Sequence, residues 1–234
     1  VGDDAVPLVV SDSLATLPWS DLGVDIVIEA SGVYVDNRLA AGHLEAGADK
    51  VVITAPSDGA DIQIIYGVNH AEYEPDRHHV VSAGSDTTNA LAPVLWALRQ
   101  RFEVRNAMVT AVRAYTQAQK LVDTAAPDLR RARAAPSSIV PTTTRAATAI
   151  GSVFPEMAGR IGGYAVRVPV ATVSILELIA ELEDEAGEAD INAAFEAAAT
   201  GPLEGILGVS HDPLVSTDFR ADDRSAVVDA PLTM

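Results

Sequence analysis

The sequence contains no cysteine among its 234 residues. Disulfide bonds, thiolate metal ligands and cysteine nucleophiles are therefore excluded. It also lacks an uninterrupted apolar run of the roughly 18 residues that a membrane-spanning helix needs, and no signal peptide is recognisable at its start. We expect a cytoplasmic protein without a membrane partner.

Basic residues are scarce, with 16 lysines and arginines against 33 acidic residues and a net charge of -17. Such a chain repels nucleic acid, so we expect no nucleic-acid partner. A local group of arginines that binds a small anion is still compatible with this charge. The segment 124–138, "TAAPDLRRARAAPSS", is an irregular basic loop. Its arginines 130, 131 and 133 either bind an anion or pair with acidic neighbours.

The hydrophobic content of 48% is sufficient for one large domain or two smaller ones. In the first part of the chain, apolar runs at 24–30, 50–54, 62–67 and 79–84 predict strands. Residues 36–47 and 88–102 predict helices, and Pro93 is expected in the first turns of the second one, where proline is tolerated. Strands that alternate with helices favour a doubly wound α/β layer.

The second part of the chain is richer in β-type sequence. Long runs at 107–116 and 163–177 predict strands, shorter candidates lie at 205–210, 214–219 and 226–229, and helices are expected at 142–153 and 188–199. This pattern is typical of an α+β domain in which helices pack on a sheet.

The stretch "SAGSDTTNALAP" at 82–93 leads from a predicted strand into a predicted helix, with Asp86 at the helix start. An aspartate there accepts backbone N–H bonds and complements the helix dipole, which stabilises the helix by about 1 kcal/mol. Capping is therefore one role for Asp86. A general base or an electrostatic element for chemistry on a phosphorylated substrate is an alternative.

Motifs along the whole chain occur in the order of a known family. They are "GVDIVIEASG", "KVVITAPSD", "YGVNH", "SAGSDTTNALAP", "AYTQAQKLVD", "DLRRARAAPSSIVPTTTRAA", "GYAVRVPVATVS", "GPLEGILGVS", "DPLVSTDF" and "SAVVDAPLTM". In this order and spacing the chain resembles phosphorylating glyceraldehyde-3-phosphate dehydrogenase. The resemblance implies a partial Rossmann NAD-binding domain at 1–85, without its glycine-rich start, and an α+β catalytic domain at 86–234, without its C-terminal end.

The resemblance also implies that both catalytic side chains of the family are replaced. Asp86 stands at the position of the family's cysteine, and Arg113 stands at the position of its histidine. A carboxylate cannot replace a thiolate that must form a thioester, and arginine keeps its proton and cannot act as a base. We therefore expect the family reaction to be absent, and we expect Asp86 and Arg113 to form an ion pair.

The phosphate sites of the family have matching residues in this chain. The resemblance implies that Thr116 and Arg167 hold the substrate phosphate. Ser85, Thr87, Arg131 and Thr144 would surround inorganic phosphate, since hydroxyl and guanidinium groups suit phosphate oxygens. Arg145 departs from the pattern because the family has glycine there, and it either fills that site or adds a donor.

For the cofactor, the resemblance implies that Ser31, Gly32 and Thr54 line the NAD groove at the carboxyl ends of strands. Ordinary turn residues at strand ends would have the same sequence. Without the glycine-rich turn we expect this chain alone not to bind NAD; because the first residue is Val1, an upstream segment would change that. His78 and His79 have no partners at metal-ligand spacing, so we expect strand-edge roles and no metal.

Three functions remain open at this point. The first is a pseudoenzyme or partner subunit that binds phosphate or a sugar phosphate and assembles as a homo-oligomer, a tetramer in the family, with the loop that starts at Asp128 reaching a neighbouring subunit. The second is an NAD-dependent oxidoreductase acting on an aldehyde, or a repurposed enzyme that uses Asp86. The third is a degenerate fragment without activity.

Overall fold

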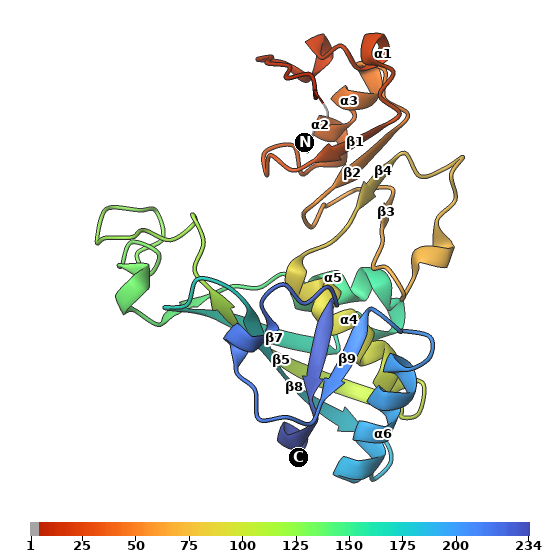
Figure 1. The fold of residues 1–234 in the computed structure, drawn as a ribbon, viewed down its shortest axis with the longest axis vertical. Coiled ribbons are helices and arrows are strands. Elements are labelled where there is room, and N and C mark those ends of the chain that lie inside the picture. Colours follow the sequence, from red (N-terminus) through yellow and green to blue (C-terminus); the bar gives the residue numbers. More distant parts are fainter. Residues whose placement is uncertain (1–4) are drawn as a thin grey trace. The chain divides into compact units, whose positions relative to one another are not determined.

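The computed structural model describes residues 5–234, which form two compact units (Figure 1). The first unit comprises residues 5–64 together with Asn69–Ser85, and the second comprises Ile65–Val68 together with Asp86–Met234. The four-residue segment Ile65–Val68 therefore belongs to the second unit although it interrupts the first one in sequence.

The first unit contains a four-stranded sheet in which every pairing is parallel. The strand order is β1-β2-β4-β3. Its strands are β1 Ile26–Glu29, β2 Lys50–Ile53, β3 Ile62–Gln63 and β4 Val80–Ser82, and its helices are α1 Trp19–Leu22, α2 Asn37–Ala40 and α3 Gly42–Glu45. Ala40, Val51, Ile53 and Val80 form its buried core. Parallel strands with intervening helices confirm the expected α/β class.

Short polar and glycine signals determine where the helices of this unit begin and end. Asp36 caps α2, because its side chain accepts a hydrogen bond from the backbone N–H of Arg38 at 2.9 Å. Gly23 ends α1 in the left-handed conformation, with a φ of 64°, which glycine adopts without steric cost. Gly23 thus ends α1 shortly before β1, and Asp36 starts α2 after it.

The second unit is built on a four-stranded mixed sheet with a small two-stranded sheet beside it. The strand orders are β6-β7-β5-β8 and β10-β9. The strands are β5 Val104–Ala114, β6 Val140–Thr142, β7 Ile161–Val168, β8 Ser174–Leu182, β9 Leu207–Ser210 and β10 Ala226–Asp229, and the helices are α4 Asp86–Arg99, α5 Ala146–Val153 and α6 Glu188–Ala199. β5 and β7 are parallel, whereas β8 runs antiparallel to β5.

The core of the second unit lies between the large sheet and its helices. Helix α4 packs against β5 and β8, and α5 packs against β7. Val109 and Ala111 alternate along β5 on the side that faces the helices, and Leu95 and Ile150 meet them from α4 and α5; all four are fully buried. This arrangement of helices on a sheet is the expected α+β domain.

Several predicted element boundaries are wrong. The predicted helix 36–47 is two short helices that follow each other through Ala41, whose φ of -58° and ψ of -19° are still helical. The predicted strand 62–67 ends at Gln63, because Ile65–Val68 belongs to the second unit. The predicted strand 214–219 contains a 3-10 helix instead, where the side chain of Asp218 accepts a hydrogen bond from the N–H of Val215 at 2.8 Å.

Two further corrections concern the second unit. The run 163–177 is not one strand but parts of β7 and β8, because Pro169 cannot donate to a ladder and Val173 adopts a left-handed φ of 65°. Pro93 lies in the interior of α4 and is buried, not in its first turns, because the helix begins at Asp86. The strands at 205–210 and 226–229 and the helices at 142–153 and 188–199 are present, with shorter bounds for two of them.

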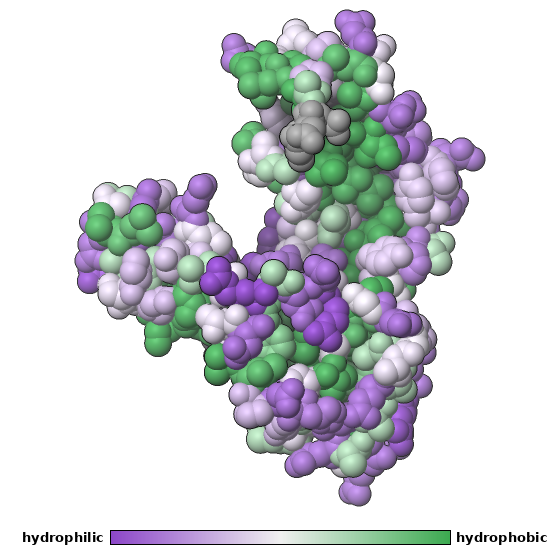
Figure 2. All heavy atoms as spheres, viewed as in Figure 1, coloured by the Kyte–Doolittle hydropathy of each residue, from purple (hydrophilic) through white to green (hydrophobic). Residues whose placement is uncertain are grey.

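Apolar side chains also reach the surface of each unit (Figure 2). In the first unit Ile26 and Ile28 are exposed on β1, and in the second unit Met108 and Ile179 are exposed on β5 and β8. No helix among residues 5–234 is both long enough and apolar enough to cross a membrane.

Two adjacent glycines of β7 provide a test of the β5–β7 packing. A Cβ at Gly163 would lie 2.4 Å from the carbonyl oxygen of Val109, whereas a Cβ at Gly162 would meet only the flexible end of Met108 at 3.4 Å. Gly163→Ala should therefore lower the free energy of unfolding by about 1–3 kcal/mol, measured by chemical denaturation. Gly162→Ala is the control and should be neutral or slightly stabilising. Equal effects of the two substitutions would contradict this packing.

Candidate functional site

Asp86 is the first residue of α4, at the start of the second unit. Its Oδ1 accepts hydrogen bonds from the backbone N–H of Thr87 at 2.8 Å and from the Thr87 hydroxyl at 3.3 Å. Asp86 is thus the first residue within the helix and not the capping residue before it, and its carboxylate accepts the N–H of the next residue, which differs from the expected cap. Thr87 is buried, and its two hydrogen bonds to Oδ1 restrict the orientation of the Asp86 carboxylate.

The expected contact between Asp86 and Arg113 is present. Nη2 of Arg113 donates to both carboxylate oxygens of Asp86, at 2.5 Å from Oδ1. The Asp86 side chain is 65% exposed and the Arg113 side chain only 17% exposed, so the carboxylate lies on the solvent side of the guanidinium. An ion pair with one partner this exposed contributes at most about 1 kcal/mol to stability.

Arg113 belongs to a group of three guanidiniums, Arg113, Arg131 and Arg167, which we call the arginine cluster. Arg113 and Arg167 are directly paired in the parallel register of β5 and β7. Burial and the charge of Arg113 hold the pKa of Arg167 below its usual value; Asp86 opposes this shift and Arg131 adds to it. The Nε atoms of Arg113 and Arg167 are buried and have no hydrogen-bond partner within the described part of the chain.

The remaining arginine of the cluster is held at its edge. Nη2 of Arg131 donates to the hydroxyl of Thr142 at 2.9 Å, and its Nε lies 3.3 Å from Oδ2 of Asp128. Arg133 also pairs with an acidic neighbour, Asp123, at 3.2 Å. The alternative interpretation of the basic loop, that its arginines pair with nearby carboxylates, therefore holds for Arg131 and Arg133.

Thr116 follows β5, close in sequence to the end of Arg113's strand. Its backbone N–H donates to Oε1 of the buried Gln119 at 2.9 Å, which closes a tight turn. Nη1 of Arg167 donates to the carbonyl oxygen of Ala114 at 2.6 Å, two residues before Thr116. The structure therefore brings Arg167 to the segment that leads into Thr116; that the two share a phosphate site stays a prediction.

Three other predicted phosphate residues lie at the ends of elements. Thr144 accepts a hydrogen bond from the N–H of Ala146 at 3.2 Å, and Arg145 is the residue at the N-cap of α5. Ser85 precedes Asp86 directly and is the last residue of the first unit. The hydroxyl of Thr144 therefore accepts the N–H of the first residue of α5.

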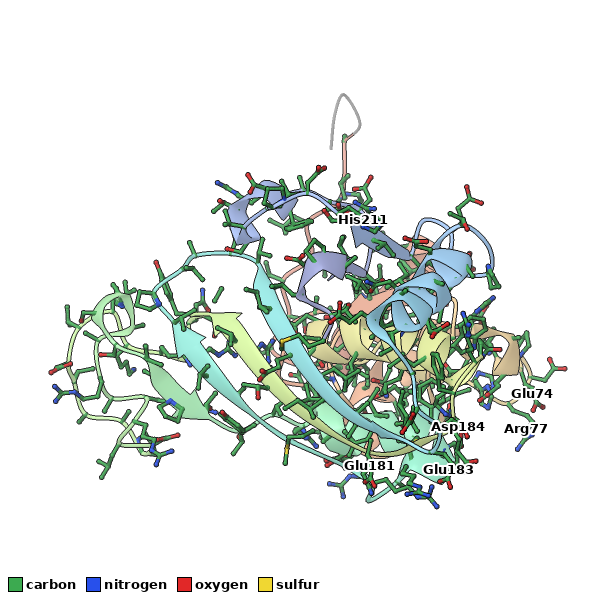
Figure 3. All side chains as sticks on the ribbon, turned by 90° about the horizontal axis from the view of Figure 1, so that it is seen from below. Glu74, Arg77, Glu181, Glu183, Asp184 and His211 are labelled. Carbon is green, nitrogen blue, oxygen red and sulfur yellow. The ribbon has the colours of Figure 1, made fainter. Side chains whose placement is uncertain are left out.

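Most other ion pairs of the chain are solvent-exposed surface pairs, unlike the arginine cluster. Arg105 bonds to Glu183 and lies 3.7 Å from Glu181, and Figure 3 shows these two carboxylates together at the end of β8. Arg77 and Glu74 pair at 2.9 Å and are both mostly exposed. The arginine cluster differs because Arg113 and Arg167 are partly buried and their Nε atoms are removed from water.

The sequence reasoning missed a buried polar network in the first unit. The indole N–H of Trp19 donates to Nδ1 of His43 at 3.0 Å, and Nε2 of His43 contacts Oε2 of Glu29 at 3.1 Å. Because an indole N–H only donates, Nδ1 is the acceptor and Nε2 carries the proton that bonds to Glu29. Glu29 and His43 are both buried. The sequence signal that could have indicated this network is the charged Glu29 within the otherwise apolar stretch "IVIEA".

This network reaches the predicted cofactor residues. Oε1 of Glu29 accepts a hydrogen bond from the N–H of Ser31 at 2.7 Å and also bonds to the Ser31 hydroxyl. The hydroxyl of Thr54 donates to the carbonyl oxygen of Glu29 at 3.2 Å. Gly32 has a φ of 72° and open space where a Cβ would lie. Ser31, Gly32 and Thr54 thus lie at the carboxyl edge of the parallel sheet, where open α/β sheets bind ligands; that they line a nucleotide site stays a prediction.

The two histidines of "RHHV" have the local roles expected for them. Nδ1 of His78 accepts a hydrogen bond from the N–H of Glu74 at 3.0 Å, and the N–H of His79 donates to Asp61 at 2.7 Å. Within residues 5–234 no group of three or more histidine or acidic side chains has the geometry of a metal site.

Sequence comparison decides the family. The profile of the domain described as "Glyceraldehyde 3-phosphate dehydrogenase, C-terminal domain" matches residues 85–234. The chain belongs to the glyceraldehyde-3-phosphate dehydrogenase family. The match begins at the residue before α4 and extends through the whole of the second unit apart from Ile65–Val68.

Full-length relatives extend the likeness to the first unit. A glyceraldehyde-3-phosphate dehydrogenase of Geobacillus stearothermophilus is 49% identical over 218 residues, which are 93% of this chain and 65% of that protein. One of Mycolicibacterium smegmatis is 47% identical over 234 residues, all of this chain and 68% of that protein. The chain therefore spans about two thirds of the length of these relatives.

Acid stability tests the Glu29 network. Burial alone would raise the pKa of Glu29, but hydrogen bonds from Ser31 and His43 outweigh it and hold the pKa below its usual value. A lowered folded-state pKa gives stability that is present above the unfolded pKa and lost as pH falls through the folded one. Glu29→Gln should lower the melting temperature most at neutral pH, and the difference from the unmodified chain should shrink below about pH 4.5.

The physical reason is that the glutamine amide would direct an N–H against Nε2–H of His43, at a cost of about 1–3 kcal/mol. Glu74→Gln is the control, because Glu74 forms an exposed pair with Arg77; it should change the melting temperature little at any pH. A gap between Glu29→Gln and the unmodified chain that stays constant from pH 7 to pH 3.5 would contradict the network.

Proposed function

We propose that this chain binds inorganic phosphate or a sugar phosphate and does not oxidise glyceraldehyde 3-phosphate. The observation that carries the proposal is the arginine cluster, in which two partly buried arginines on adjacent strands have buried Nε atoms without acceptors. Guanidinium forks match the oxygens of a tetrahedral anion. The protein has a net charge of -17, so three neighbouring guanidiniums are a local exception, and a bound anion would reduce the repulsion between them.

The loss of the family chemistry follows from residue types. The chain has no cysteine, so no thiolate is available to attack an aldehyde and form a thioester. We propose that Asp86 stands at the nucleophile position and Arg113 at the position of the base. Their ion pair supports this, because the two side chains lie as close together as a nucleophile and its base must. Neither group performs the replaced role at neutral pH, since the carboxylate lacks thiol chemistry and the guanidinium keeps its proton.

Arg167 is the residue whose loss should weaken phosphate binding most. Arg167→Gln should reduce the affinity for inorganic phosphate and for glyceraldehyde 3-phosphate at least about tenfold, because a partly buried, charged donor fork is removed. Arg167→Lys should retain part of the affinity as a point charge. Isothermal titration calorimetry measures both affinities, and the melting curves show whether each variant folds.

Arg101→Gln is the matched control. Arg101 pairs with Asp190 at 2.9 Å on the surface, so its loss removes the same charge without touching the cluster. Its phosphate affinity should match that of the unmodified chain. If Arg101→Gln and Arg167→Gln lowered the phosphate affinity equally, the loss would come from the net charge of the protein, and the proposed phosphate site would be contradicted.

A turnover assay separates this proposal from an NAD-dependent oxidoreductase of the same family. In that alternative, Ser31, Gly32 and Thr54 would hold part of the nucleotide, which supplies the hydride acceptor when bound. We expect the chain with NAD, glyceraldehyde 3-phosphate and phosphate to form no NADH above the rate without protein. Sustained NADH absorbance would overturn the pseudoenzyme proposal.

A second candidate function is that of a partner subunit, favoured by the outer face of the large sheet. Met108, Ile179, Ile175 and Tyr164 are between 49% and 63% exposed. The register brings Met108 opposite Ile179, so these two side chains are adjacent on the exposed face of the sheet, where Glu177 separates them from Ile175. Exposed apolar surface of this kind typically marks a protein interface, and we propose that a second copy of the chain covers it.

Light scattering tests this assembly. The chain should have the mass of a dimer or a larger oligomer, and Ile179→Glu should shift it toward the monomer, because a charge would be buried in an apolar contact. Val215→Glu is the control, since Val215 is equally exposed but lies outside the sheet, and it should keep the assembly intact. A monomeric unmodified chain would contradict the proposal.

A further inference from the structure

The exposed Asp86 and the arginine cluster beneath it have opposite charges and unequal contact with water. The carboxylate is 65% exposed, whereas the Arg113 side chain that it contacts is 17% exposed. Besides Arg113, Asp86 is held by Thr87, its neighbour in sequence. A rotation of one side chain at the helix start is therefore enough to uncover the Arg113 guanidinium.

Asp86 acts on more than its direct partner. It is the negative charge that opposes the lowering of the Arg167 pKa by burial and by the two other arginines. Arg167 is neutralised by no carboxylate of its own among the described ion pairs, and its Nη1 donates to a neutral carbonyl oxygen of Ala114. The single charge of Asp86 is therefore shared between two guanidiniums and balances only one of them.

We propose that Asp86 is a displaceable internal counterion of the arginine cluster, so that the site excludes monoanions and admits phosphate or phosphomonoester dianions. This inference rests on the proposed phosphate-binding function and adds how the site selects its ligand. A monoanion that replaces the Asp86 carboxylate gains no charge interaction. A dianion brings one more negative charge and further oxygens to the same guanidiniums, so it displaces the carboxylate with a net gain.

The inference assigns Asp86 a role that differs from capping and from catalysis. A cap or a ligand contact would make Asp86 favourable for anion binding or neutral to it. A competing carboxylate makes it unfavourable, so its removal must strengthen binding. The sign of the effect therefore separates the three roles.

The experiment is a calorimetric titration of the chain and of Asp86→Asn with inorganic phosphate and, separately, with acetate at fixed ionic strength. Asp86→Asn keeps the shape of the side chain and its acceptor for the Thr87 N–H, but removes the charge. We expect phosphate to bind about five- to tenfold more tightly to Asp86→Asn. Acetate should bind measurably only to the variant, so that the preference for the dianion becomes smaller.

Asp190→Asn is the matched control. Asp190 also lies in the first turn of a helix, α6, and also pairs with an arginine, Arg101, at 2.9 Å, but it is not part of the arginine cluster. Its phosphate affinity should stay within about twofold of that of the unmodified chain, because it changes only the net charge.

Each other result has a distinct meaning. Unchanged or weaker phosphate binding in Asp86→Asn, with the expected loss in Arg167→Gln, would overturn the displacement and leave the phosphate site standing. An equal gain in Asp86→Asn and Asp190→Asn would reduce the effect to net charge and also overturn it. The absence of phosphate binding in every variant would refute the proposed function and this inference together.

Discussion

The register between β5 and β7 is the constraint on which the site depends. It pairs Arg113 with Arg167 at the same level of two parallel strands, where hydrophobic packing against α4 and α5 holds both backbones in place. Two adjacent positive charges with restricted access to water are stable only near an anion. Asp86, at the start of α4, supplies one, and the proposed ligand supplies the rest.

The same packing explains why the ion pair of Asp86 and Arg113 is partly open to solvent and not enclosed. The buried face of α4 holds its axis against the sheet, while its first residue remains exposed. Asp86 can therefore neutralise Arg113 without being buried itself. In the first unit the carboxylate of Glu29 is buried instead. Its two oxygens accept hydrogen bonds from the N–H of Ser31 and from Nε2–H of His43. The carboxylate of Asp86 is thus largely exposed, whereas that of Glu29 is buried.

Much of the fold could be predicted from the sequence, because the apolar runs of β1, β2 and β5 are local signals. The boundaries that failed depend on distant residues. Ile65–Val68 reads as the end of a strand, but Ile65 joins the core of the second unit. Of the site, the Asp86–Arg113 contact was predicted through a family resemblance. The Trp19–His43–Glu29 network was not, because its three members lie on different elements and no local pattern connects them.

The sequence by itself determined what chemistry is impossible. A chain without cysteine has no thiolate, and this holds in any fold. Membership of the glyceraldehyde-3-phosphate dehydrogenase family is likewise a property of the sequence. Only the tertiary structure decided which charges meet. Arg113 and Arg167 are 54 positions apart in the sequence but adjacent in the sheet. The unequal exposure of Arg113 and Asp86 follows from strand pairing and helix packing. Electrostatic interactions depend on distance in space and on burial, and neither can be read along the chain.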